Sequence, residues 1–128
     1  MKVLVVDDDE SLSAIIATAL EKEGFSTLST KTGREALEKA RSEVPDLILL
    51  DQVLPDISGN EVLKQLKLDI QTKNIPVMMI TNFSQEELVN QAINEGAIDY
   101  LFKYKVEIQD IVGKVKNALK KDEPSPFA

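Results

Sequence analysis

The sequence predicts an α/β fold, a (βα)5 chain whose doubly wound, five-stranded parallel sheet carries helices on both faces. Three observations lead to this prediction. Short apolar runs alternate five times with segments whose apolar residues repeat at helical spacing. Several of these runs contain no polar alternation, as is typical of strands covered on both faces. Glycine and proline fall between the two kinds of segment, where helices end and strands begin.

The five apolar runs are the predicted strands. They are Val3–Val6, Phe25–Ser29, Leu47–Leu50, Val77–Ile80 and Ile98–Phe102. Pro45 and Pro76 precede the third and the fourth run. Crossovers between parallel strands are right-handed. For the strand order we adopt 2-1-3-4-5, which is a common order for five strands and is not deduced from these residues.

Amphipathic helices are predicted after each strand. Their apolar positions are Leu12, Ile15, Ile16, Ala19 and Leu20; Ala36, Leu37 and Ala40; Val62, Leu63 and Leu66; Leu88, Val89, Ala92 and Ile93; and Ile108, Ile111, Val112, Val115 and Leu119. Thr32 and Ser84 suit N-caps, and Ser84 with Glu87 fits a capping box. Gly24 and Gly96 suit the ends of the first and fourth helices.

The length of the chain and its composition limit the possible functions. With 128 residues, we expect one domain over residues 1–121, followed at 122–128 by a disordered tail or the start of a linker. The net charge of −7 disfavours nucleic acid as a direct partner. The lack of cysteine and histidine excludes disulfides, a Ser-His triad and a phosphohistidine on this chain. We expect a cytoplasmic protein with no membrane partner, because no apolar run approaches the ~20 residues of a membrane span.

Polar side chains follow four of the predicted strands, and in a parallel sheet these positions share one edge. Asp7 and Asp8 follow the first strand, and Asp51 follows the third. Thr81 and Lys103 follow the fourth and the fifth. In such sheets, ligands bind at the point where the strand order reverses. We therefore expect three carboxylates, a hydroxyl and an ammonium group to share one shallow site.

Carboxylates that lie this close together need a cation, because their charges repel one another. Hard oxygen ligands without histidine or thiolate favour Mg²⁺ or Mn²⁺. Mg²⁺ keeps waters and accepts a phosphate oxygen, and Lys103 and Thr81 suit the other side of a phosphoryl group. The neighbouring acids Asp9 and Glu10 are expected to cap the first helix rather than to bind metal.

The segments VLVVDDDE, LILLDQVLPDISG, MMITN and DYLFK resemble the receiver domains of two-component response regulators, in particular single-domain, chemotaxis-regulator-like members. The resemblance extends from Lys2 to Lys121, and the motifs occur in the family's order and at its spacings, Pro55 and Gly59 included. It implies a flavodoxin-like fold and a phosphorelay signalling switch rather than an enzyme with a separate substrate.

The resemblance also implies roles for single residues. Asp51 would accept a phosphoryl group from the phosphohistidine of a sensor histidine kinase or phosphotransfer protein. Asp7 and Asp8 would hold Mg²⁺ through carboxylates and water, together with Asp51 and the backbone carbonyl of Val53. The missing histidine fits this scheme, because the phosphoryl donor must be another molecule.

Three further residues would act around the phosphoryl group. Thr81 and Lys103 would contact the phosphoryl oxygens, and Tyr100 would change position when Thr81 is drawn inward. The surface of the fourth helix, fifth strand and fifth helix would then be recognised by partners. The protein would be a monomer or a phosphorylation-dependent dimer, and the sequence does not identify its downstream target.

The chain departs from the family at two positions. Tyr104 follows Lys103 where the family usually has a proline with a cis bond, so the placement of Lys103 is open. Asn82 follows Thr81 where a small residue is usual, and its amide is expected to narrow access to Asp51.

Two other functions are compatible with parts of the pattern. VVDDDES also fits a haloacid-dehalogenase-like phosphatase, with Asp7 as nucleophile and Asp9 as acid and base. Such a fold wants a further acidic pair after the lysine strand, where this chain offers only Glu107 and Asp110 within a helical pattern. The other alternative is a receiver-like interaction module that acts without phosphorylation.

Overall fold

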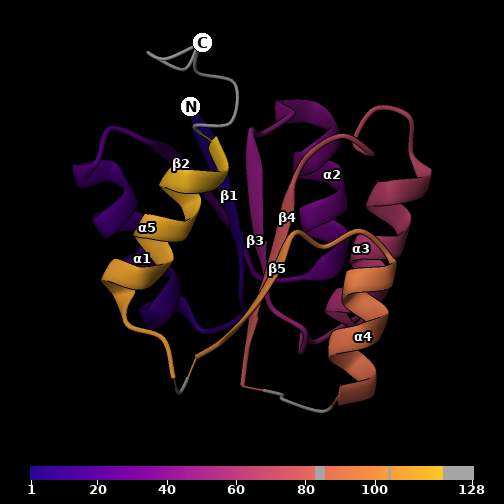
Figure 1. Ribbon diagram of the computed structural model, residues 1–128. Helices are drawn as coiled ribbons and strands as arrows, with labels where there is room; N and C mark the ends of the chain where they lie inside the picture. The colour runs from indigo at the N-terminus through magenta and orange to yellow at the C-terminus, as the bar shows by residue number, and fades with distance from the viewer. Residues whose placement is uncertain (83–85, 104, 120–128) are drawn as a thin grey trace, which may run out of the picture.

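The computed structural model describes residues 1–82, 86–103 and 105–119, in which strands and helices alternate along the chain (Figure 1). The elements are β1 (Lys2–Val6), α1 (Glu10–Lys22), β2 (Ser26–Thr30), α2 (Gly33–Glu43), β3 (Leu47–Leu50), α3 (Gly59–Leu68), β4 (Val77–Thr81), α4 (Glu86–Asn94), β5 (Asp99–Phe102) and α5 (Ile108–Leu119). Each strand agrees with its predicted apolar run to within one residue at either end.

The strands form one parallel sheet in the order β2-β1-β3-β4-β5, which confirms the expected topology. Val6 lies opposite Leu50 in the register of β1 and β3. Because Asp7 and Asp51 are the next residues along, the two carboxylates leave the sheet at the same level on neighbouring strands. Similarly, the N–H of Lys103 donates to the carbonyl of Thr81 at 2.8 Å, so β4 and β5 end together.

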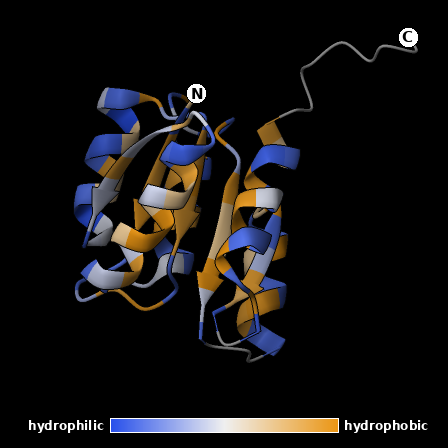
Figure 2. Cartoon of the chain, turned by 90° about the vertical axis from the view of Figure 1, so that its left-hand side faces the viewer, coloured by the Kyte–Doolittle hydropathy of each residue, from blue (hydrophilic) through white to orange (hydrophobic). Residues whose placement is uncertain are grey.

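Helices cover both faces of the sheet: α1 and α5 lie on one side, and α2, α3 and α4 on the other (Figure 1). Successive strand residues point to opposite faces. Val3 and Val5 accordingly pack in the apolar cluster beneath α1 and α5, whereas Leu4 and Val6 pack beneath α2 and α3. Figure 2 shows the result, with hydrophobic strands inside and hydrophilic helix surfaces outside. Among the described residues, none of the helices combines the length and the apolar character that crossing a membrane requires.

The helix ends follow the predicted chemistry wherever they are described. The Asp9 side chain caps α1 by accepting the N–H of Leu12 at 3.1 Å, and Thr32 caps α2 in the same way. Gly24 and Gly96 have φ of 93° and 104°, a left-handed conformation that glycine adopts after a helix without steric cost. The predicted cap at Ser84 lies outside the described residues.

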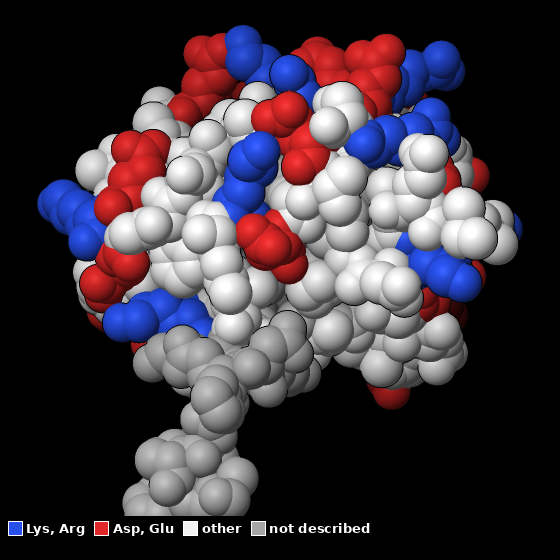
Figure 3. All heavy atoms as spheres, turned by 90° about the horizontal axis from the view of Figure 1, so that it is seen from above, with Lys and Arg blue, Asp and Glu red and all other residues white. Residues whose placement is uncertain are grey.

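The face at which the strands begin is shown in Figure 3, where acidic and basic side chains are interspersed. At this edge, Lys2 pairs with Glu43 at 3.2 Å and Arg41 with Asp69 at 2.7 Å. The functional residues predicted from the sequence follow the strands and therefore lie at the opposite edge. The expected site is thus separated from this mixed surface by the full length of the strands.

Candidate functional site

Three carboxylates meet where β1 and β3 end. Oxygen atoms of Asp7, Asp8 and Asp51 all lie within 4.8 Å of one another. Asp7 and Asp51 are 1% and 5% exposed, whereas Asp8 is open to solvent. This geometry has the donor chemistry of a site for a hard divalent cation, with one ligand reachable from water.

Lys103 bridges the two buried carboxylates. Its Nζ lies 2.7 Å from Asp7 Oδ2 and 3.0 Å from Asp51 Oδ2. Burial alone would lower the pKa of Lys103, but the hydrogen bonds and negative charge of Asp7 and Asp51 outweigh it and raise the pKa. Lys103 therefore carries its positive charge at the point where a phosphoryl group bound to Asp51 would place negative charge.

The surroundings of Asp7 disfavour its charged form. Burial raises the pKa of its carboxyl above the usual range, and the nearby charge of Asp51 adds to this effect. The Lys103 ammonium and the N–H of Asp9, which donates to Asp7 Oδ1 at 2.9 Å, act in the opposite direction without cancelling it. A cation at this place would relieve the repulsion between the two carboxylates.

The β3–α3 connection holds Asp51 in place. The N–H of Val53 donates to Asp51 Oδ1 at 3.3 Å, and the N–H of Gly59 donates to the carbonyl of Gln52 at 2.7 Å. A Cβ on Gly59 would lie 2.2 Å from the carbonyl oxygen of Asp51, so only glycine lets α3 begin this close to β3. This close approach gives a physical reason for glycine at that spacing after Asp51.

A hollow of about 260 Å³ opens over these groups. The residues that line it are Asp7, Asp8, Asp9, Asp51, Val53, Thr81, Asn82 and Lys103. The structure therefore brings together all the residues that were predicted to contact the metal and the phosphoryl group, and Asn82 also lines the hollow. Tyr104, the other departure from the family pattern, lies outside the described residues.

Tyr100 lies near this hollow but does not line it. The side chain is buried among the apolar residues beneath α2, α3 and α4, and its ring centroid is 5.5 Å from that of Phe102. Burial raises the pKa of its hydroxyl, with a further contribution from the charge of Asp51. The hydroxyl has no hydrogen-bond partner among the described residues.

Sequence reasoning missed two features between the end of β3 and the first turn of α3. Asp56, to which the sequence pattern assigned no contact, accepts the N–H groups of Gly33 and Arg34 at 2.8 and 2.9 Å and so ties the loop to the first turn of α2. Gln52 and Asn60 are both buried, although their polarity predicts exposure. The polar Asn60 within the apolar stripe of α3 was the available signal for a buried contact.

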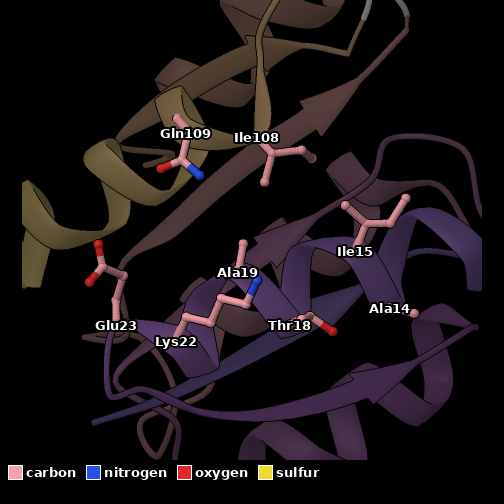
Figure 4. Close-up of a pocket in the computed structure, with 8 residues that line it drawn as sticks. All are labelled: Ala14, Ile15, Thr18, Ala19, Lys22, Glu23, Ile108 and Gln109. Atoms are coloured by element: carbon pink, nitrogen blue, oxygen red, sulfur yellow. The ribbon is translucent and has the colours of Figure 1, made fainter.

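A larger hollow lies elsewhere, between α1 and α5, with a volume of about 640 Å³ (Figure 4). Ile15 lines it and is 53% exposed, so its prediction as a buried helix position was wrong. The apolar stripe of α1 is narrower than the sequence indicated, because contact with the sheet reaches Ile16 and Leu20 while Ile15 faces the groove toward α5. Ile93 on α4 is likewise 48% exposed.

Comparison with known proteins decides the family. Residues 3–116 match the model of the response regulator receiver domain. The chain belongs to this family. Receiver domains are the phosphoacceptor signalling modules of two-component systems, and the acidic cluster at the end of β1 and β3 is compatible with their binding of Mg²⁺.

Relatives of this receiver domain occur in two lengths. The alkaline phosphatase synthesis transcriptional regulatory protein PhoP of Bacillus subtilis is 38% identical over 122 residues, which are 95% of this chain and 50% of PhoP. The chain thus spans about half the length of that relative. The polar-differentiation response regulator DivK of Brucella ovis is 33% identical over 117 residues, covering 91% of this chain and 94% of DivK.

Solved structures share the same fold. A CheY-like response regulator receiver domain protein from Methanospirillum hungatei superposes with a TM-score of 0.86 at 31% identity, covering 94% of both chains. A two-component response regulator from Clostridium difficile gives 0.89 at 27% identity, covering 97% of this receiver domain and 99% of that chain. These likenesses confirm the flavodoxin-like (βα)5 architecture predicted from the sequence.

Proposed function

We propose that Asp51 is the phosphoryl acceptor of this receiver domain. Asp7, Asp8, Asp51 and the carbonyl of Val53 would hold Mg²⁺ or Mn²⁺ beside it. The observation that carries the proposal is the meeting of three carboxylates within 4.8 Å, with the Lys103 ammonium 3.0 Å from Asp51 in the same hollow. A phosphoryl group on Asp51 needs a metal on one side and a fixed cation on the other. The carboxylates would bind the metal, and Lys103 is the cation.

The chemistry begins with two negatively charged reactants. An Asp51 carboxylate oxygen attacks the phosphorus of a phosphohistidine on a sensor kinase or phosphotransfer protein. The P–O bond forms as the P–N bond breaks, and the electron pair returns to the histidine nitrogen. A bound Mg²⁺ supplies positive charge that stabilises the transferring phosphoryl group.

The residues of this chain contribute position and charge. Lys103 already lies between Asp7 and Asp51, so its ammonium is within reach of a phosphoryl oxygen without a large movement. Thr81, fully buried at the end of β4, lines the hollow and would donate its hydroxyl to another phosphoryl oxygen. The backbone N–H bonds to Asp7 and Asp51 hold both carboxylates in place during transfer.

Phosphorylation would then change the surface of α4, β5 and α5. It adds about −1.5 to −2 charges and three strong acceptors at Asp51. Thr81 moves toward the phosphoryl group, and Tyr100 moves into the space that Thr81 leaves. The buried Tyr100 hydroxyl, which lacks a partner among the described residues, supports a second position for this side chain.

Other aspects of the function are proposals on the same basis. The receiver domain would comprise residues 1–121 and act in the cytoplasm as a monomer or phosphorylation-dependent dimer, with no chemistry beyond its own phosphorylation and dephosphorylation. A phosphatase that uses Asp9 as acid and base receives less support, because the Asp9 carboxylate accepts the N–H of Leu12 as the cap of α1. A module that acts without phosphorylation also receives less support, because it would not need the carboxylates, the hydroxyl and the ammonium group that line one hollow.

The test is the intact mass of the protein after incubation with phosphoramidate and Mg²⁺. We expect a single phosphate adduct that requires Mg²⁺ and is absent from Asp51→Asn. Asp46→Asn, at the opposite edge of the sheet, is a matched control that should still take the phosphate. A folded protein that binds Mg²⁺ and forms no adduct would favour the module that acts without phosphorylation.

A further inference from the structure

A chain of polar contacts, buried at Gln52 and Asn60 and exposed at Gln91, begins at the residue after the proposed acceptor. Gln52 is 4% exposed and directly follows Asp51. Its side-chain Oε1 accepts the N–H of Asn60 at 2.7 Å, and its backbone carbonyl accepts the N–H of Gly59 at 2.7 Å. Both carbonyl groups of Gln52 are therefore fastened to the first turn of α3, so a movement of β3 at Asp51 displaces that turn.

Asn60 continues the chain of contacts to α4. Its side chain is 5% exposed, and Nδ2 lies 3.3 Å from the carbonyl of Leu88 and 3.3 Å from Oε1 of Gln91. The helix it reaches is loosely packed, since Ala92 is the one fully buried residue in the described α4. The hydrogen bonds from Asn60 thus add to the apolar contacts of Val89 and Ala92 in fixing α4 against α3.

This contact has unused hydrogen-bonding capacity. Gln52 Nε2 and Asn60 Oδ1 are buried without a partner among the described residues. A hollow of about 290 Å³ lies beside them, lined by Gln52, Asn60, Leu88 and Gln91 among others. An unpaired buried donor and acceptor next to free space permit a second arrangement of the same side chains.

We propose that Gln52, Asn60 and Gln91 form a polar relay that couples the state of Asp51 to the position of α4, with Asn60 as the central positioning residue. The proposal rests on the phosphoacceptor role of Asp51. Phosphorylation changes the backbone around Asp51, Gln52 moves with it, and Asn60 then exchanges its partners on α4. The relay acts on the face of α4 toward α3 and is separate from the path through Thr81 and Tyr100.

The test measures amide hydrogen exchange along α4, residues 86–94, with and without phosphoramidate and Mg²⁺. Gln91→Leu removes the acceptor on α4, and Gln91→Glu keeps an acceptor oxygen at the same place. Asn90→Leu alters the exposed neighbour on the same helix and serves as the control. Gln52→Leu breaks the relay at its start, on a residue whose described hydrogen bonds go to α3.

In the unphosphorylated protein, we expect Gln52→Leu and Gln91→Leu each to speed exchange in α4 by roughly three- to tenfold, the scale of one lost hydrogen bond. Intact mass should show that Gln91→Leu still takes one phosphate. Its change in α4 exchange on phosphorylation should fall to less than about half that of the wild type, whereas Gln91→Glu and Asn90→Leu retain it.

Two results would overturn the relay. One is Gln52→Leu with wild-type exchange in α4, because the described hydrogen bonds of Gln52 reach α4 through Asn60. The other is a phosphorylated Gln91→Leu protein whose α4 responds as the wild type does. If the wild type takes no phosphate, the acceptor role fails, and the effect of Gln52→Leu on α4 still decides whether the relay exists.

Discussion

At the scale of single residues, the site keeps polar groups where burial disfavours them. Asp7 has a raised pKa beside Asp51, and Tyr100 has a buried hydroxyl without a partner among the described residues. Such groups lower stability unless a ligand or a second conformation satisfies them. Asp7 lines the hollow and Tyr100 is buried near it, which is consistent with a site that is completed by phosphorylation.

Tyr100→Phe should stabilise the unphosphorylated protein by about 1 kcal/mol, because it removes a buried hydroxyl that lacks a partner while keeping the ring against Phe102. Urea denaturation of the metal-free protein measures this, as a higher midpoint with an unchanged m-value. A lower midpoint would show that the hydroxyl has a favourable contact in the folded state.

Asn82→Ala should shorten the lifetime of the phosphorylated form roughly three- to tenfold, a change of about 1 kcal/mol in the hydrolysis barrier. Asn82 lines the hollow with Thr81, and we expect its amide to restrict the approach of water to Asp51. The decay of the phosphate adduct after removal of phosphoramidate gives the half-life by intact mass. Equal half-lives in the two proteins would exclude this role.

At the scale of elements, the β3–α3 loop is fixed to a neighbouring helix. The Asp56 carboxylate accepts two N–H groups at the start of α2, and a Cβ on Gly33 would lie 2.5 Å from Ile57 of the same loop. The loop and the helix therefore pack as one unit. This unit also carries Val53, whose carbonyl is a proposed metal ligand.

Asp56→Asn should be less stable than wild type at pH 7, and this difference in stability should shrink as the pH falls toward 3. Burial acts to raise the pKa of Asp56, but the N–H donors of Arg34 and Gly33 outweigh it and lower the pKa below 3.8. A lowered folded-state pKa means that the carboxylate stabilises the fold above the unfolded pKa and loses this contribution as pH falls through the folded pKa. Urea midpoints between pH 7 and pH 3 measure the difference.

The control for this experiment is Glu38→Gln, at an exposed position on α2. We expect no comparable loss of stability at pH 7 in this variant. A difference between Asp56→Asn and wild type that stayed constant down to pH 3 would mean that the charge of Asp56 contributes nothing and that shape alone fixes the loop.

How far the sequence predicts each element depends on the range of the forces involved. Strand ends and the caps at Asp9, Thr32 and Gly24 are local, so spacing alone places them. Val44 ends α2 with φ of 42°, a conformation that favours glycine, so its residue type gave no signal. The contacts of Asp56 with α2 and of Asn60 with α4 depend on tertiary packing, which a linear pattern does not contain.

At the scale of the whole molecule, the site exists only in the folded sheet. Its carboxylates Asp7 and Asp51 follow different strands and are 44 positions apart in the sequence. The sequence predicted that they meet, because a parallel sheet aligns the ends of its strands. The pairing of Val6 with Leu50 shows this alignment for β1 and β3. Folding therefore concentrates negative charge, and binding of a cation is linked to global stability.

Asp7→Asn should stabilise the protein without metal and leave it less stable than wild type when metal is added. The raised pKa of Asp7 means that its proton favours the fold and that this contribution is lost as pH rises through the folded pKa, so at pH 7 the charged group is destabilising. Without metal, the variant should be more stable than wild type by on the order of 1 kcal/mol, since Lys103 keeps its contact with Asp51.

With Mg²⁺ at about a hundred times the dissociation constant, wild type should gain about 2.7 kcal/mol, because the ion binds the folded chain alone. Asp7→Asn lacks one of the three carboxylates and should gain much less, so the order of the two urea midpoints inverts. Measuring both proteins in EDTA and across a Mg²⁺ series separates the two effects. If the midpoints of the two proteins rose in parallel with Mg²⁺ and did not invert, the metal would lie away from Asp7. If the variant were less stable than wild type in EDTA, the ion pair between Asp7 and Lys103 would outweigh the repulsion from Asp51.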